Sequence, residues 1–217
     1  MKRAAIFDLD GTLVHSAPAI LLAANAMRDE FEMPPLSLQV LTTYIGGGIP
    51  LLVQRCLGGQ HQDEDRAEKA LQIFIRHYER EPTKDCRLYD GVFDLLSELS
   101  RRGWLMGVCT NKSEGFARRI IADMGIDSFF TEIVGGDTLL VKKPDPEPLL
   151  HVISNLGSSV AETIFIGDSE VDADTALNAA CNFFFFEGGY QVNQSTLKFS
   201  GTRFKDYRNL AALLQSI

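Results

Sequence analysis

The chain has 217 residues, of which 45% are hydrophobic and 9% aromatic, and its formal net charge is −8. This hydrophobic fraction is enough for a proper core, so the composition argues against a disordered chain. The negative charge argues against nucleic acid as a partner, because binding to a phosphate backbone needs clustered Lys and Arg. It leaves room for a small phosphorylated ligand, which needs only one or two local cations.

Three features of the sequence bear on its location. Lys2 and Arg3 bring charge into the N-terminus too early for the apolar region of a signal peptide. No stretch approaches the roughly 18 apolar residues of a membrane span. The four cysteines are widely spaced and include no CxxC pair, which is typical of reduced thiols. We therefore expect a cytoplasmic protein that does not interact with membranes.

The first predicted strand, AAIFDL at residues 4–9, leads into two aspartates, Asp8 and Asp10. Side chains two residues apart on a strand point to the same side, so these carboxylates are expected to share a space. In a parallel sheet that space lies beyond the carboxyl ends of the strands, where ligands bind. Two close carboxylates repel, and a cation or a shared proton would offset the cost.

Residues 16–85 contain several segments with apolar positions at helical spacing and no convincing strand. They predict a helical insert after the first strand, and His15, just before it, is expected to be a hinge residue. Gly46, Gly47 and Gly48 lie between two predicted helices of this insert. Their backbone N–H groups are candidates for binding a small carboxylate, and a plain flexible connector is the alternative.

The rest of the chain alternates short apolar runs with helical patterns, which predicts an α/β protein with a parallel sheet and helices on both faces. Three of the helical patterns end at a glycine, as helices with a left-handed stop do. The apolar runs cover residues 104–110, 132–136, 163–168 and 182–187, and the helical patterns cover 92–103, 114–125, 146–157 and 170–180.

Two polar segments follow predicted strands or precede predicted helices. CTNKS offers the Thr110 hydroxyl, the Asn111 amide and backbone N–H groups where a helix begins, which together suit an anion. In VKKPDPEPL, Lys142 and Lys143 precede a proline that favours extended backbone at the residue before it. A solvated lysine is the alternative interpretation of this second segment.

The segment GDSEVDAD places Asp168 after a strand and Asp172 four residues later, on one face of a starting helix. One of these acids can be explained by capping of the helix. Four acids within seven residues exceed what capping needs, and they suit a hard cation such as Mg²⁺, which prefers oxygen ligands.

Together, DLDGT, the strand-end Thr-Asn, KPDP and GDSEVD resemble the haloacid dehalogenase superfamily of phosphohydrolases. The resemblance implies a three-layer α/β/α Rossmann-like core, formed by residues 1–15 and 86–217, with a helical cap at residues 16–85. Within the superfamily, the segments DLDGTLVHSAP, YIGGGIPLLVQRCL and FFFFEGGY are similar to phosphoglycolate phosphatases.

The resemblance also implies roles for the reacting groups. Asp8 would be the nucleophile that forms an aspartyl-phosphate. Asp10 would be the general acid for the leaving alkoxide and then the base that activates water. Thr110, with Asn111 beside it, would bind the phosphoryl oxygens, and Lys143 would neutralise the nucleophile and the phosphoryl charge. Lys142 is a substitute for Lys143 in this role, although Lys143 directly precedes the proline.

The metal site implied by the resemblance combines both acidic segments. Asp168 would bind Mg²⁺ together with the Asp8 carboxylate and the Asp10 backbone carbonyl, and Asp172 would help directly or through water. Gly47, in the cap loop, would contact the substrate. The cation and Lys143 would reverse the local negative charge that otherwise repels a phosphate dianion.

The resemblance thus implies a magnesium-dependent phosphatase for a small phosphorylated metabolite, with 2-phosphoglycolate as the best candidate. A pyrophosphatase or a sugar phosphomutase shares the same core residues and remains open. A dehalogenase is disfavoured because it needs no acid at Asp10, and a phosphonate hydrolase because the predicted helices of the cap offer only Lys69 for an imine. A non-catalytic phosphate-binding protein is disfavoured because all four acids are present. The sequence leaves open whether the protein is a monomer or a homodimer.

Overall fold

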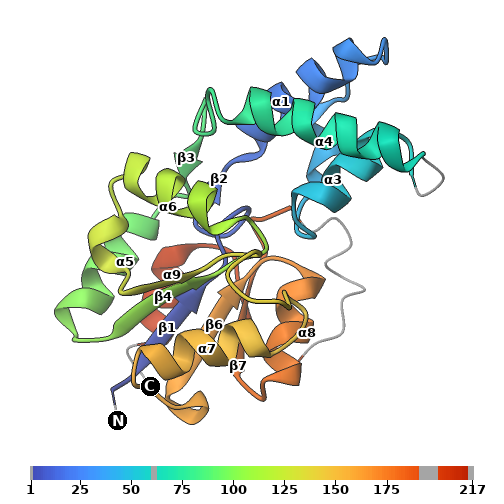
Figure 1. The fold of residues 1–217 in the computed structure, drawn as a ribbon. Helices are drawn as coiled ribbons and strands as arrows, with labels where there is room; N and C mark the ends of the chain where they lie inside the picture. The colour runs from blue at the N-terminus through green and yellow to red at the C-terminus, as the bar shows by residue number, and fades with distance from the viewer. Residues whose placement is uncertain (1, 60–62, 191–199, 215–217) are drawn as a thin grey trace.

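The centre of the molecule is a six-stranded sheet in which all neighbouring strands are parallel (Figure 1). The computed structural model describes residues 2–59, 63–190 and 200–214. The spatial order of the strands is β5-β4-β1-β6-β7-β8. The strands are β1 (Ala4–Phe7), β4 (Leu105–Cys109), β5 (Glu132–Val134), β6 (Thr163–Gly167), β7 (Asn182–Phe186) and β8 (Thr202–Phe204).

Helices cover both faces of this sheet, as the strand–helix alternation predicts, so the α/β fold is confirmed. Alternate strand residues pack on opposite faces. Within β7, Phe184 and Phe186 belong to one hydrophobic cluster, and Phe183 and Phe185 to the other. The first cluster packs against α5 (Val92–Arg101), α6 (Glu114–Asp123) and α9 (Tyr207–Leu213), and the second against α7 (Glu147–Asn155) and α8 (Glu170–Asn178). Two short 3₁₀ turns complete the connections, at Asp127–Phe129 and Val160–Glu162.

Four helices follow the first sheet strand and form a separate layer above the carboxyl ends of the strands (Figure 1). Their apolar faces build a third hydrophobic cluster, with Met27, Leu41 and Phe74 among its buried members. The two chain segments that lead into and out of these helices lie side by side, because β2 and β3 pair in antiparallel fashion. The elements are β2 (Val14–His15), α1 (Ala17–Glu30), α2 (Leu38–Thr42), α3 (Ile49–Cys56), α4 (Glu64–Tyr78) and β3 (Arg87–Leu88).

The end of α4 packs against α6, a helix of the sheet layers. The Tyr78 and Phe116 rings meet edge to face, with their centroids 4.8 Å apart. Just beyond α4, the Arg119 guanidinium donates to the carbonyl of Glu79 at 2.8 Å. These contacts hold the helical layer down on the sheet at the edge where the polar sequence motifs lie.

The structure departs from the sequence-based expectations at three places. The first strand ends at Phe7 rather than at residue 9. The last segment forms β8 and α9, which the sequence patterns did not predict. Ala180, rather than a glycine, takes the left-handed conformation after α8, with a φ of 52°. All four cysteines are free, and among the described helices none is long and apolar enough to cross a membrane.

Candidate active site

The polar motifs meet at the carboxyl edge of three adjacent strands. Phe7 at the end of β1 pairs with Val108 of β4 and with Ile166 of β6, so these strands end at nearly the same level. The residues that follow them are Asp8, Thr110 and Asp168, and all three are buried. Residues 58 to 160 positions apart in the sequence therefore converge, because parallel strands end at one edge of a sheet.

A tight turn after Asp8 brings the chain against Asp168. Gly11 has a φ of +90°, and a Cβ on it would lie 2.5 Å from the Asp168 Oδ2 atom. Only glycine meets both demands, the left-handed backbone and the close approach. The turn also directs the Thr12 hydroxyl, which donates to Asp168 Oδ1 at 2.8 Å. The backbone N–H of Tyr190 donates to the other oxygen at 2.7 Å.

Three buried carboxylates form one cluster at this edge. Asp8, Asp168 and Asp172 each offer an oxygen, and these oxygens lie within 4.8 Å of one another. Burial raises the pKa of Asp8 to about 6, although Lys143 opposes the shift. Burial, together with the charges of Asp172 and Asp8, raises the pKa of Asp168 well above its ordinary value. Lys143 brings one positive charge to three carboxylates, and their all-oxygen donor set suits a hard divalent cation such as Mg²⁺.

Asp172 is held by the start of its own helix. The Ser169 hydroxyl accepts from the Asp172 backbone N–H at 3.2 Å, and the Asp172 carboxylate accepts from the Ser169 backbone N–H at 3.1 Å. This reciprocal pair is a capping box, which satisfies two backbone donors at the start of α8. The capping role expected for one acid of this segment therefore falls to Asp172, and the same carboxylate also belongs to the acidic cluster.

Lys143 is the lysine that reaches the cluster. Its ammonium lies 3.0 Å from Asp8 Oδ1 and 2.5 Å from Asp172 Oδ1, and its side chain is only 2% exposed. Burial opposes this charge, but Asp172 and Asp8 raise the pKa of Lys143 above its ordinary value. Lys142 instead donates to the carbonyl of Gly47 at 2.9 Å. The geometry thus separates the two lysines that the sequence left as alternatives.

Asn111 connects this edge to the helical layer. Its side-chain amide donates to the carbonyl of Lys143 and to the carbonyl of Gly46, both at 3.0 Å. The loop with three consecutive glycines is therefore tied to the sheet edge through backbone atoms. Gly46 and Gly48 line a small cavity between the sheet edge and the helical layer, whereas Gly47 contacts Lys142 through its carbonyl.

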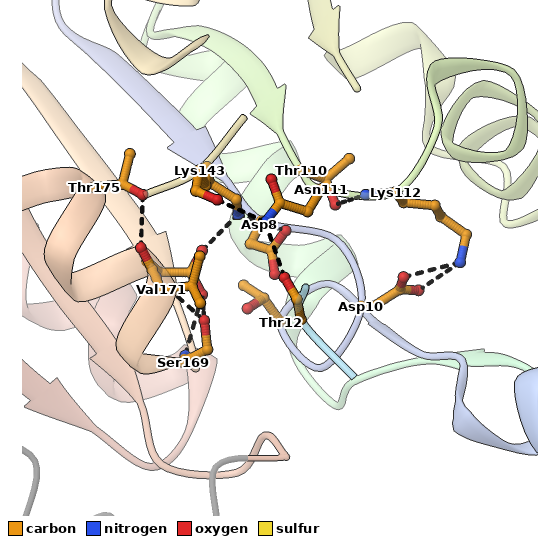
Figure 2. Close-up of polar contacts among 12 residues, drawn as sticks. Asp8, Asp10, Thr12, Thr110, Asn111, Lys112, Lys143, Ser169, Val171 and Thr175 are labelled. Atoms are coloured by element: carbon orange, nitrogen blue, oxygen red, sulfur yellow. Dashed lines mark hydrogen bonds and ion pairs between the residues drawn. The ribbon is translucent and has the colours of Figure 1, made fainter. Parts of the chain in front are cut away.

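Asp10 lies apart from the three-carboxylate cluster (Figure 2). Because the strand ends at Phe7, the turn carries the Asp10 side chain toward the helical layer. Its two oxygens accept from the Lys112 ammonium at 2.9 and 3.1 Å, and it also accepts from the Ser16 hydroxyl. Asp8 and Asp10 thus face the same cavity, but each has a lysine of its own.

Sequence reasoning missed several residues of this site. Lys112 stands directly after Thr110 and Asn111 in CTNKS, so its place beside an anion-binding pair was the available signal. Ser16 occupies the N-cap of α1 but makes no side-chain cap, because its hydroxyl serves Asp10. Tyr190 had no signal beyond its place at the end of FFFFEGGY.

A small cavity of about 30 Å³ separates the sheet edge from the helical layer. Polar groups of the sheet edge lie on one side of it, and mostly apolar residues of the helical layer lie on the other. Its lining comprises Asp8, Asp10, Thr110, Asn111 and Lys112 from the edge, and Ile20, Ile45, Gly46, Gly48, Ile49, Leu52, Phe74 and Tyr78 from the helical layer. This arrangement offers hydrogen-bonding groups near Asp8 that suit a phosphoryl group, and it exposes Asp10 to the same cavity.

Comparison with known proteins identifies the family. The model of the haloacid dehalogenase-like hydrolases matches residues 5–186. A phosphoglycolate phosphatase of Cereibacter sphaeroides is 42% identical over 188 residues, which span 86% of this chain and 85% of that protein. A phosphoglycolate phosphatase of Rhodospirillum rubrum is 39% identical over 196 residues, spanning 88% of this chain and 81% of that protein. The crystal structure of a predicted phosphoglycolate phosphatase from Haemophilus somnus has a TM-score of 0.90 at 29% identity, covering 99% of this chain and 98% of that one. The chain therefore belongs to the haloacid dehalogenase-like hydrolases.

Proposed function

We propose that this protein is a magnesium-dependent phosphatase that hydrolyses 2-phosphoglycolate through an aspartyl-phosphate on Asp8. The observation that carries the proposal is the placement of two acids in one cavity with different partners. Asp8 lies beside Lys143 and the acidic cluster, and Asp10 lies on the side of the cavity that faces the helical layer. The substrate is proposed because the relatives named above are phosphoglycolate phosphatases.

The first half-reaction transfers the phosphoryl group to the protein. A carboxylate oxygen of Asp8 forms a bond to phosphorus, and the bond from phosphorus to the ester oxygen breaks. Asp10 gives its proton to that oxygen, which leaves as an alcohol. Lys143 lies 3.0 Å from Asp8 and offsets the negative charge of the incoming phosphoryl group, while the Thr110 hydroxyl hydrogen-bonds its oxygens.

The second half-reaction restores the protein. Asp10, now ionised, takes a proton from a water molecule, and the water oxygen forms a bond to phosphorus. The bond between phosphorus and the Asp8 oxygen breaks, which releases inorganic phosphate and returns the Asp8 carboxylate. The proton taken from water leaves Asp10 ready to act as an acid again.

The carboxylates of Asp8, Asp168 and Asp172 would hold Mg²⁺, with the Asp10 backbone carbonyl as a further proposed ligand. When bound, the cation supplies positive charge to the phosphoryl oxygens. Both oxygens of Asp172 already have partners, Lys143 and Ser169. Because a carboxylate oxygen has two lone pairs, Asp172 keeps the capacity to assist directly or through water.

We also propose that residues 16–85 act as a cap over a core of residues 1–15 and 86–217. The helices of this segment have a hydrophobic cluster of their own, and two short paired strands connect them to the sheet. A sugar phosphomutase, which shares the core residues, is the alternative that a substrate panel distinguishes.

Phosphate release from a panel of esters, with and without Mg²⁺, tests this proposal. The panel contains 2-phosphoglycolate, a sugar phosphate and pyrophosphate. We expect magnesium-dependent release with a preference for 2-phosphoglycolate, and loss of turnover by about 10⁴-fold or more in Asp8→Asn. Asp174→Asn, which changes an exposed acid of α8, is the matched control.

Each other outcome points elsewhere. Preference for pyrophosphate would replace the proposed substrate, and conversion of the sugar phosphate to an isomer would indicate a mutase. Unchanged hydrolysis in Asp8→Asn would contradict the nucleophile assignment.

A further inference from the structure

The Tyr78 hydroxyl is a buried polar group without a hydrogen-bond partner among the described residues. Tyr78 is the last residue of α4 and is only 1% exposed, and it lines the cavity next to Asp10 and Lys112. A buried hydroxyl without a partner costs free energy, so such groups in native proteins usually serve a ligand or water. Burial raises the pKa of Tyr78 to about 12, so its hydroxyl keeps its proton and can donate it in a hydrogen bond.

Lys112 presents a second donor to the same space. Its side chain is 3% exposed, and its ammonium lies 5.0 Å from the centre of the Tyr78 ring. Burial opposes its charge, but the Asp10 carboxylate raises the pKa of Lys112 above its ordinary value, so Lys112 stays a cation. An ammonium has three N–H donors, and the two contacts with Asp10 leave one for another acceptor.

The rest of the cavity wall is unsuited to charge. On the side of the helical layer it consists of apolar side chains, such as Ile20, Leu52 and Phe74, and glycine backbone. Among the described residues that line it, Lys112 alone is positively charged. On this side of the cavity, the place between Lys112 and Tyr78 is therefore the one that favours an anionic group.

We propose that the Lys112 ammonium and the Tyr78 hydroxyl form a subsite for a carboxylate on the leaving group of the substrate. The proposal rests on the phosphatase function given above and names how that site selects its substrate. A carboxylate fits better than a second phosphate, because two donors are too few for a dianion next to Asp10.

The position of this subsite agrees with the chemistry. In 2-phosphoglycolate the carboxylate carbon is separated from the ester oxygen by one methylene group. A carboxylate held at Lys112 therefore places the ester oxygen close to Asp10, which contacts the same ammonium. Positioning of the leaving oxygen by a remote group of the substrate is a recognised source of rate.

The subsite also joins two parts of the molecule. Lys112 follows β4 of the sheet, and Tyr78 ends α4 of the helical layer. A carboxylate bound to both would stabilise their docking, so a substrate that carries it would favour the closed arrangement. An ester without a carboxylate would lack this contribution.

The test compares 2-phosphoglycolate with ethyl phosphate, in which a methyl group replaces the carboxylate. For each ester, kcat and KM are measured in the wild-type protein, in Tyr78→Phe and in Lys112→Met, with saturating Mg²⁺. We expect the ratio of the two kcat/KM values to fall by about 10- to 100-fold in each variant, mainly through a higher KM for 2-phosphoglycolate. Each variant's ratio is compared with the wild-type ratio, so the difference in intrinsic reactivity between the two leaving groups cancels.

Two control variants match the two changes. Lys69→Met changes an exposed lysine of α4, and Tyr44→Phe changes a half-buried tyrosine outside the cavity lining. Both should keep the wild-type ratio. Circular dichroism and thermal unfolding show whether each variant folds, and Tyr78→Phe, which removes one oxygen atom, carries the test if Lys112→Met does not fold.

Three outcomes would overturn the subsite. If each variant lost the same factor in kcat/KM on both esters, Lys112 and Tyr78 would act by supporting Asp10 or the fold rather than by binding a carboxylate. The phosphatase function would stand in that case. A wild-type protein that hydrolyses ethyl phosphate as well as 2-phosphoglycolate would exclude selection by the carboxylate. Hydrolysis of neither ester by folded wild-type protein would instead remove the proposed function on which the subsite rests.

Discussion

Two buried lysines, one in contact with Asp8 and the other with Asp10, differ in what surrounds them. Lys143 contacts Asp8 and Asp172, and its ammonium lies 5.4 Å from the Phe165 ring, so all its partners come from the sheet and its helices. Lys112 contacts Asp10 and the ring of Tyr78, which belongs to the helical layer. The residues around Asp8, the proposed phosphoryl side, are therefore held within the sheet layers. The residues around Asp10, the proposed leaving-group side, include Tyr78 from the helical layer.

The carboxylates that the two lysines contact also differ in how deeply they are buried. The Asp172 side chain is fully buried and the Asp8 side chain 9% exposed, whereas the Asp10 side chain is 13% exposed and keeps the Ser16 hydroxyl as a second partner. A carboxylate that loses its cation is penalised more when water cannot replace it. The two lysines should therefore respond differently to the same substitution.

The largest expected effect is on folding stability. Lys143→Met leaves two buried carboxylates without their cation and should lower the free energy of unfolding by about 3–5 kcal/mol. Lys112→Met leaves the more exposed Asp10 and should cost about 1–3 kcal/mol. Urea unfolding without metal measures both values, and equal losses would contradict the distinction between the two lysines.

The next effect is on turnover. Lys143→Met should lower kcat by about 10²- to 10³-fold on every ester, because its charge acts on the phosphoryl group that all esters share. The loss in Lys112→Met should depend on the ester. Rates measured with Mg²⁺, well below the unfolding temperature of each variant, distinguish a uniform loss from one that depends on the leaving group.

A smaller effect concerns pH and metal on the phosphoryl side. The pKa of Asp8 is raised from 3.8 to about 6 and that of Asp168 is also raised, so the native protein holds protons that the unfolded chain has released. The stability of the metal-free protein should therefore fall as the pH rises from about 4 through 6. Thermal unfolding in EDTA measures this slope.

Added Mg²⁺ and the variant Asp168→Asn are the controls for this pH dependence of stability. Bound Mg²⁺ should raise the unfolding temperature most at neutral pH, where the carboxylates are ionised. Asp168→Asn should stabilise the metal-free protein at neutral pH and weaken the response to Mg²⁺. A response unchanged by this substitution would place the metal elsewhere.

The smallest effect is expected at the connection between the two regions. The Tyr190 hydroxyl accepts from the backbone N–H of Ala17 at 2.9 Å and forms a hydrogen bond with His15 Nδ1 at 3.2 Å, while the Tyr190 backbone N–H donates to Asp168. Tyr190→Phe removes only the two contacts of the hydroxyl and should lower the free energy of unfolding by about 1 kcal/mol. Chemical denaturation measures it, with Tyr44→Phe as the matched control. A loss as large as that in Lys143→Met would mean that this connection stabilises the sheet layers themselves.

Most of the sheet edge could be predicted from short motifs. Asp8 and Asp168 were expected at strand ends, and the alternation of strands and helices predicted a parallel sheet that brings such ends together. The C-terminal strand and helix were missed, because β8 has only three residues and shows no clear alternation. The left-handed Ala180 was missed because the sequence signal for that conformation is glycine.

The sequence alone determined the fold class, the family resemblance and the acids that meet at the sheet edge. Local spacing is sufficient for these, because a residue next to a strand end is placed by the strand itself. The tertiary structure decided which lysine serves which acid, and it placed Tyr78 in the cavity. These pairings depend on the turn after Phe7 and on the docking of α4 against α6, which bring together residues distant in the chain. Such contacts follow from packing between elements, and no local pattern encodes them.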